Sequence, residues 1–265
     1  MLTETTARTR EEHVPRSPRN HRWTLRGAAR GAAGLLGGVP RQAGAPPEGG
    51  GERLAPAEAL RLLREGNRRA VRGGRSGRTT GAGRAAGAGR PLAAVLACVD
   101  CRVPPETLFD REPGSLLVIR TAAHTLDAMV EGSVEYGPVE LDVPLVVVLG
   151  HERCETVAAA VTARATGVRP PAHLAVASAR LAQACRVGAR LPGDAVENTV
   201  RAQTDRVVAR LREDPVLLPL LRQGALEVVG AHYRAGSGEV EFLTGPAPRL
   251  PGRSSPTPAA GPDRP

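Results

Sequence analysis

The sequence predicts an α/β protein with a mainly parallel central β-sheet flanked by helices. Two short, nearly continuous apolar runs, at residues 91–97 and 143–149, are rich in Val and Leu. This composition is typical of strands that are buried on both faces of a parallel sheet. Helical patterns alternate with these and further strand-like segments, which favours a parallel sheet covered by helices on both sides. Aromatic residues make up 2% of the chain, so Ala, Val and Leu must supply nearly all of the core.

The first predicted element is an amphipathic helix over residues 56–72. Pro56 suits the first helical turn, and Leu60 and Leu63 begin an apolar stripe at helical spacing. A Gly/Arg-rich loop follows over residues 73–90.

The remaining elements follow from the alternation of apolar runs with helical patterns. The last strand comes after Gly236-Ser237-Gly238 and is expected to form a hairpin at the edge of the sheet. Strands are predicted at 92–98, 115–120, 144–149, 225–232 and 239–243, and helices near 126–137, 154–166, 172–187 and 194–213.

The two ends of the chain have the composition of disordered segments. Residues 1–54 combine Arg, Gly and Pro, and residues 245–265 contain seven Pro among 21 positions. We therefore expect one folded domain over residues 55–244, between a disordered leader and a disordered tail.

Positive charge is concentrated toward the N-terminus. Residues 1–90 contain 18 Arg and 7 acidic residues, a balance of +11, which leaves −2 for the rest of the chain. A basic arm can attract nucleic acid or an anionic membrane, but this one has no interleaved aromatic residues to stack on bases. We find neither an export signal nor an apolar run of about 18 residues that could span a membrane. We expect a cytoplasmic protein without nucleic-acid or membrane partners.

Polar side chains follow two of the predicted buried strands. Cys98, Asp100 and Arg102 come at the end of one strand, and His151 and Cys154 follow another. Ligands gather at the carboxyl ends of strands in open α/β sheets, so these side chains could converge on one ion. Two thiols and an imidazole are ligands of a catalytic zinc site. A helix that begins near Cys154 would favour the thiolate form through its dipole.

The two motifs resemble those of β-class carbonic anhydrases. These motifs are Cys-x-Asp-x-Arg-Val-Pro-Pro-Glu and, about fifty residues later, Gly-His-x-x-Cys, and the resemblance covers roughly residues 55–244. It implies reversible hydration of carbon dioxide to bicarbonate and a proton, which is a lyase reaction, with one Zn²⁺ per chain. It also implies a homodimer or a tetramer built from dimers. By the same resemblance, Cys98, His151 and Cys154 are the zinc ligands, and Asp100 with Arg102 is the catalytic dyad.

The expected mechanism depends on an open coordination position. Zinc with three protein ligands lowers the pKa of its bound water to about 7, and the resulting hydroxide attacks carbon dioxide. Arg102 can hold the Asp100 carboxylate through two parallel hydrogen bonds. Without that hold, Asp100 could bind the metal and block the position. With it, Asp100 would accept a hydrogen bond from the hydroxide.

Several residues near the motifs depart from the family pattern. Cys101 replaces a serine, Glu155 replaces a glycine, and His124 ends a segment that is usually Asn-Ala-Gly-Asn. Glu155 would raise the pKa of the bound water if it faced the metal. His124 is either a proton relay or a histidine hydrogen-bonded in a turn.

Cys101 leaves two alternatives to the catalytic interpretation. The first is a non-catalytic zinc protein, either a decayed family member that acts as a bicarbonate sensor or scaffold, or a closed structural site of Cys98, Cys101, His151 and Cys154 that leaves no position for water. A redox dithiol of Cys98 and Cys101 would compete with metal binding. Strand alternation points Cys101 to the face opposite Cys98, which favours the three-ligand site.

Overall fold

The structure is a computed structural model that describes residues 54–73 and 90–243. These residues belong to one compact unit. The predicted leader up to residue 53, most of the Gly/Arg-rich loop and the predicted tail lie outside the described residues. No helix in the described part of the chain is long and apolar enough to cross a membrane.

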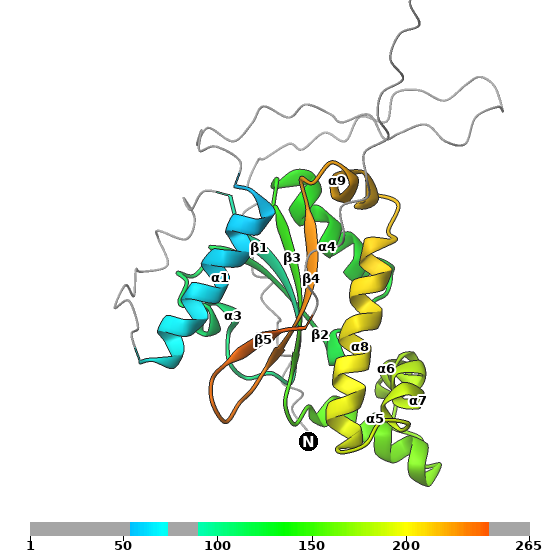
Figure 1. Ribbon diagram of the computed structural model, residues 1–265. Helices are drawn as coiled ribbons and strands as arrows, with labels where there is room; N and C mark the ends of the chain where they lie inside the picture. The colour runs from blue at the N-terminus through cyan, green and yellow to red at the C-terminus, as the bar shows by residue number, and fades with distance from the viewer. Residues whose placement is uncertain (1–53, 74–89, 244–265) are drawn as a thin grey trace, which may run out of the picture. The chain divides into compact units, whose positions relative to one another are not determined.

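A five-stranded sheet forms the centre of the unit, in the order β2-β1-β3-β4-β5 (Figure 1). The neighbours β2 and β1, β1 and β3, and β3 and β4 run parallel, whereas β5 pairs antiparallel with β4. The mainly parallel sheet and its hairpin edge are therefore confirmed. The strands are β1 (Ala93–Cys98), β2 (Leu116–Thr121), β3 (Leu145–His151), β4 (Glu227–Tyr233) and β5 (Val240–Phe242).

Helices cover both faces of this sheet, as the apolar runs predicted. Figure 1 shows α1 on one side and α4, α8 and α9 on the other. The helices are α1 (Pro56–Val71), α3 (Pro105–Leu108), α4 (Ala128–Glu140), α5 (Glu155–Thr166), α6 (Leu174–Arg180), α7 (Ala182–Gly188), α8 (Ala195–Arg212) and α9 (Leu218–Arg222), with a 3₁₀ turn η1 (Ala122–His124).

The sequence patterns missed the shortest helices. The single helix predicted over residues 172–187 is two helices, which meet at Leu181. The short helices α3 and α9 and the turn η1 were not predicted, because elements of three to five residues are too short to show a helical period.

The core is aliphatic on both faces of the sheet. Leu63 of α1 packs with Val95 and Val147 in one buried cluster, and Leu211 of α8 packs with Val148 in the other. Strands β1, β3 and β4 are buried along their whole length. This burial accounts for their nearly continuous apolar sequences.

The parallel pairing of β1 with β3 determines where the functional motifs meet. Ala97 lies opposite Leu149 in the register of the two strands. Since parallel strands end at the same edge of a sheet, the residues that follow them are neighbours although about fifty positions separate them in sequence.

Candidate metal centre

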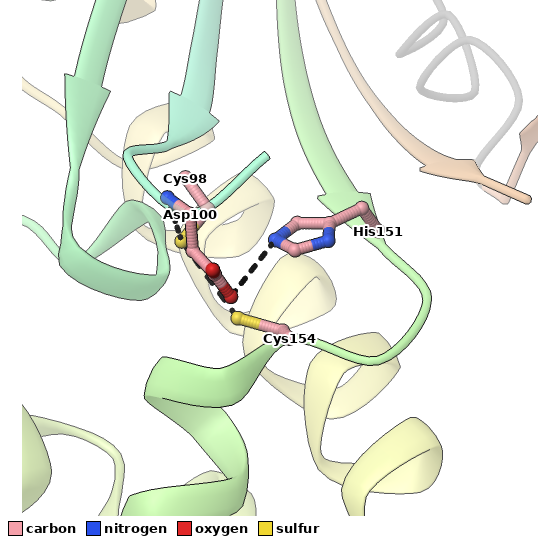
Figure 2. A group of neighbouring side chains, drawn as sticks. All are labelled: Cys98, Asp100, His151 and Cys154. Atoms are coloured by element: carbon pink, nitrogen blue, oxygen red, sulfur yellow. Dashed lines mark hydrogen bonds and ion pairs between the residues drawn. The ribbon is translucent and has the colours of Figure 1, made fainter. Parts of the chain in front are cut away.

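Four side chains from three adjoining elements converge at this edge (Figure 2). Cys98 is the last residue of β1, His151 is the last residue of β3, and Cys154 immediately precedes α5. Asp100 lies in the turn after β1. One potential ligand atom from each of these residues lies within 4.8 Å of the others. The two motifs predicted from the sequence are therefore brought together.

The geometry of the donor atoms fits a zinc ion. The sulfur atoms of Cys98 and Cys154 are 3.7 Å apart. His151 donates from Nδ1 to the carbonyl oxygen of Glu152 at 2.9 Å, which leaves the lone pair on Nε2. This Nε2 is buried without a hydrogen-bond partner, and an oxygen of Asp100 lies 3.8 Å from it. Two thiols and an imidazole whose other ring nitrogen is held by a hydrogen bond form a zinc-binding donor set.

Backbone donors favour a thiolate at Cys98. The N–H groups of Ala123 and Asp100 donate to its sulfur at 3.2 and 3.4 Å. The hydrogen bond from Cys154 lowers the pKa of Cys98 to about 3 against the opposing effect of burial, and the same contact raises the pKa of Cys154. The two sulfurs lie close enough for one cation to bind both, and such a cation would displace the proton between them.

The proposed dyad partners are separated in this structure. Asp100 accepts a hydrogen bond from the backbone N–H of Glu155 at 2.6 Å, through the same oxygen that faces His151. Arg102 is exposed, and among the described residues it makes no ion pair with Asp100. The structure therefore brings four of the five predicted site residues together and leaves Arg102 outside the group.

Cys101 lies outside the group of four donors. It is 3% exposed and belongs to the buried cluster beneath α1, whereas Cys98 and Cys154 belong to a different cluster. The Cys101 thiol donates to the carbonyl oxygen of Val103 at 3.7 Å. Because β1 ends at Cys98, the turn after the strand rather than strand alternation places Cys101 here, and the arrangement gives no support to the closed four-ligand site.

The other two departures from the family pattern do not belong to the donor group. The Glu155 side chain is exposed, and the backbone N–H of this residue is the group that contacts Asp100. His124 is 1% exposed, and its Nε2 lies 3.3 Å from the hydroxyl oxygen of Thr204. Burial lowers the pKa of His124 to about 4, which favours a neutral structural histidine over a proton relay.

Arg120 supports the site and was missed by sequence reasoning. This residue of β2 donates to the carbonyl oxygens of Cys98, Cys101 and Val103. It thereby fixes the turn that carries Asp100. The available signal was an arginine at the end of an otherwise apolar strand, where a charged side chain needs several acceptors.

The fold and the site thus define an α/β protein with a group of two thiols, an imidazole and a carboxylate, able to hold a metal ion, at the carboxyl edge of its sheet. The carbonic anhydrase family profile matches residues 93–240. "Carbonic anhydrase 2" of Mycobacterium tuberculosis is 35% identical over 194 residues, which are 69% of this chain and 90% of that protein. The chain therefore belongs to the carbonic anhydrase family, in its β class, and is a carbonic anhydrase.

Solved β-carbonic anhydrases share the fold. The Coccomyxa enzyme in complex with acetazolamide has a TM-score of 0.55 and 23% identity, covering 71% of this chain and 87% of that one. One of two tetrameric β-carbonic anhydrases from Sordaria macrospora has a TM-score of 0.52 and 23% identity, covering 61% of this chain and 84% of that one.

Proposed function

We propose that this carbonic anhydrase hydrates carbon dioxide reversibly with one zinc ion per chain. Cys98, His151 and Cys154 would be the ligands, and Asp100 with Arg102 the catalytic dyad. The observation that carries the proposal is the convergence of four donors within 4.8 Å around an imidazole nitrogen that lacks a hydrogen-bond partner.

The protein side chains have separate roles in this proposal. When bound, zinc supplies a Lewis acid that lowers the pKa of water to about 7. The two thiolates balance the charge of the ion, and His151 is held in the required tautomer by Glu152. Arg102 would draw the Asp100 carboxylate away from the donor group through two parallel hydrogen bonds. Asp100 would then accept a hydrogen bond from the reacting water and orient that water toward carbon dioxide.

We extend the proposal to organisation and location. The folded catalytic domain would span residues 55–244, between a leader over 1–54 and a tail over 245–265. We propose a homodimer or a dimer-based tetramer, and the tetrameric Sordaria macrospora enzymes support this. All four cysteines are free thiols, which supports a reducing, cytoplasmic location.

Elemental analysis combined with stopped-flow hydration tests the proposed function. Protein purified after growth with ample metal should contain about one zinc per chain and should hydrate carbon dioxide. Absence of zinc from such protein would contradict the proposal.

The Cys101→Ser variant separates the catalytic site from a closed four-ligand site. Because Cys101 packs beneath α1, the variant should keep its zinc affinity and hydrate carbon dioxide at least as well as wild type. Its free energy of unfolding should fall by about 1 kcal/mol at most, since a serine can still donate to Val103. A marked drop in zinc affinity would instead identify Cys101 as a ligand.

A further inference from the structure

The Asp100 carboxylate is held by the start of α5 rather than by Arg102. Its Oδ2 atom accepts the N–H of Glu155 at 2.6 Å and lies 3.8 Å from Nε2 of His151. The same oxygen therefore touches the helix and faces the donor group. In the described part of the chain, Arg102 offers Asp100 no competing contact.

The local structure of α5 explains why this N–H is available. Glu155 is the first residue of the helix, and the first N–H groups of a helix have no partner within it. The preceding Cys154 provides no side-chain cap. A carboxylate from another element is thus favoured here both by hydrogen bonding and by the helix dipole. Asp100 caps α5 from a turn 55 positions away in sequence.

We propose that the backbone N–H of Glu155 is a latch that retains Asp100 in its metal-facing position and opposes its transfer to Arg102. This inference rests on the proposed zinc site. It names Glu155 as a positioning residue that acts through its backbone, independently of its side-chain charge. Opening of the site then requires Arg102 to compete with a charge-assisted hydrogen bond.

Proline at position 155 removes the latch selectively. Proline lacks an N–H and is well accommodated at the first position of a helix. Cys154 has φ −66° and ψ 108°, the extended conformation that a residue before proline requires. Glu155→Ala is the matched control, because it removes the same carboxylate and keeps the N–H.

A second control tests whether proline at the start of a helix is harmless in this fold. Ala195 is the first residue of α8, and its cap Asp194 accepts hydrogen bonds from Val196 and Glu197. Ala195→Pro should therefore have the zinc affinity and pH profile of wild type. Both proline variants should retain the wild-type circular dichroism.

The latch predicts three differences between Glu155→Pro and Glu155→Ala. Zinc affinity, measured by competition with a chelator, should be severalfold weaker in the proline variant, because the carboxylate is no longer retained near the ion. The pH profile of hydration activity should move to lower pH by about one unit. If the Asp100 carboxylate binds at the metal about tenfold more weakly, water replaces it at a correspondingly lower pH. In the apo protein, α5 should also fray faster in hydrogen exchange, because it has lost its capping contact.

A measurement on the native backbone keeps the inference testable if Glu155→Pro does not fold. The amide proton resonance of Glu155 should move markedly in Asp100→Ala and remain in place in Arg102→Ala. Equal zinc affinities and pH profiles for Glu155→Pro and Glu155→Ala would overturn the latch, as would an amide resonance insensitive to Asp100. Wild-type zinc content and hydration, measured in parallel, show separately whether the proposed function holds.

Discussion

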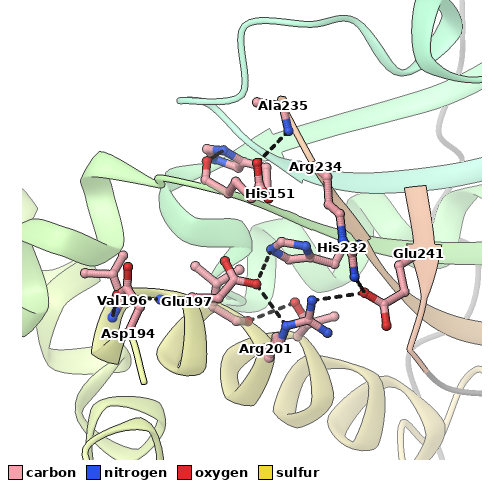
Figure 3. A network of polar contacts seen from close by, with 12 residues as sticks. His151, Asp194, Val196, Glu197, Arg201, His232, Arg234, Ala235 and Glu241 are labelled. Atoms are coloured by element: carbon pink, nitrogen blue, oxygen red, sulfur yellow. Dashed lines mark hydrogen bonds and ion pairs between the residues drawn. The ribbon is translucent and has the colours of Figure 1, made fainter. Parts of the chain in front are cut away.

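Two polar clusters lie at the carboxyl edge of the same sheet, and they differ in how their charges are matched. In the candidate metal centre, two thiols, an imidazole and a carboxylate converge without a guanidinium among them. In the second cluster, which we call the His232 network, arginines pair with each carboxylate (Figure 3). The network comprises Glu197, Arg201, His232, Arg234 and Glu241.

The distances in the His232 network show that both of its carboxylates are paired with arginines. Arg201 lies 2.9 Å from Glu197 and 3.0 Å from Glu241, and Arg234 lies 2.9 Å from Glu241. Nε2 of the fully buried His232 lies 3.1 Å from Glu197. Neither ring nitrogen of His232 makes a hydrogen bond within the described residues, so its contact with Glu197 is an ion pair only when the imidazole is protonated.

The comparison teaches that charge matching, rather than the presence of histidine and acidic residues, distinguishes the candidate metal centre from the His232 network. Donors that converge without a cationic partner keep their capacity for a metal ion. Donors already paired with arginines do not, because a metal would have to displace a guanidinium.

The largest expected difference between the clusters is in zinc binding. His151→Ala should lower zinc affinity by more than about a hundredfold, because loss of a direct ligand exceeds the usual effect of an outer-shell change. His232→Ala should keep about one zinc per chain despite its cost in packing. Elemental analysis after dialysis measures both, and zinc loss in His232→Ala alone would reverse our assignment.

Substitution of Arg102 should affect activity, whereas substitution of Arg201 should affect stability. Arg102→Ala should keep zinc but lose roughly a hundredfold in hydration rate, because Asp100 is no longer drawn away from the metal. Arg201→Ala should retain activity and lose about 1 kcal/mol of unfolding free energy, since its ion pairs are partly exposed. Stopped-flow assays and urea titrations would contradict this division if Arg102→Ala remained fully active.

Acidification should destabilise the zinc-free protein through its buried histidines. Burial lowers the pKa of His124 to about 4, so the unfolded chain binds a proton at higher pH than the native protein does. The resulting stability is fully present above pH 6.5 and is lost as the pH falls toward 4, by up to about 3 kcal/mol.

The corresponding loss from His232 should be smaller. Burial lowers its pKa as well, but the adjacent Glu197 carboxylate opposes that change. Urea unfolding at several pH values should show a flatter profile for His124→Gln than for His232→Gln. Equal slopes would contradict the distinction between the two environments.

The smallest effect is expected for deletion of residues 1–50. This segment has no periodic apolar face that could pack against the domain, so zinc content and hydration rate should remain nearly unchanged. Loss of solubility or activity in the truncated protein would show that the segment belongs to the fold or to a subunit interface.

The sequence predicted the strands, and the positions of Cys98 and His151 at strand ends, because burial leaves a strong pattern. The apolar runs place Cys98 and His151 at strand ends, and parallel pairing then brings them together. The contact between Asp100 and the N–H of Glu155 was not predictable, because backbone directions in turns leave no periodic signal. The contact between His232 and Glu197 was not predicted, because it depends on how α8 packs across β4 and not on a local sequence pattern.

The adjacency of β1 and β3 has a thermodynamic consequence for metal loading. Both strands are held by the core along their full length, so the entropic cost of assembling the ligands is met when the domain folds. Zinc would then enter a preorganised apo protein and would not be required for folding, unlike the ion of a zinc finger. At free zinc about a thousandfold above its dissociation constant, linkage would add about 4 kcal/mol to a domain that is already folded.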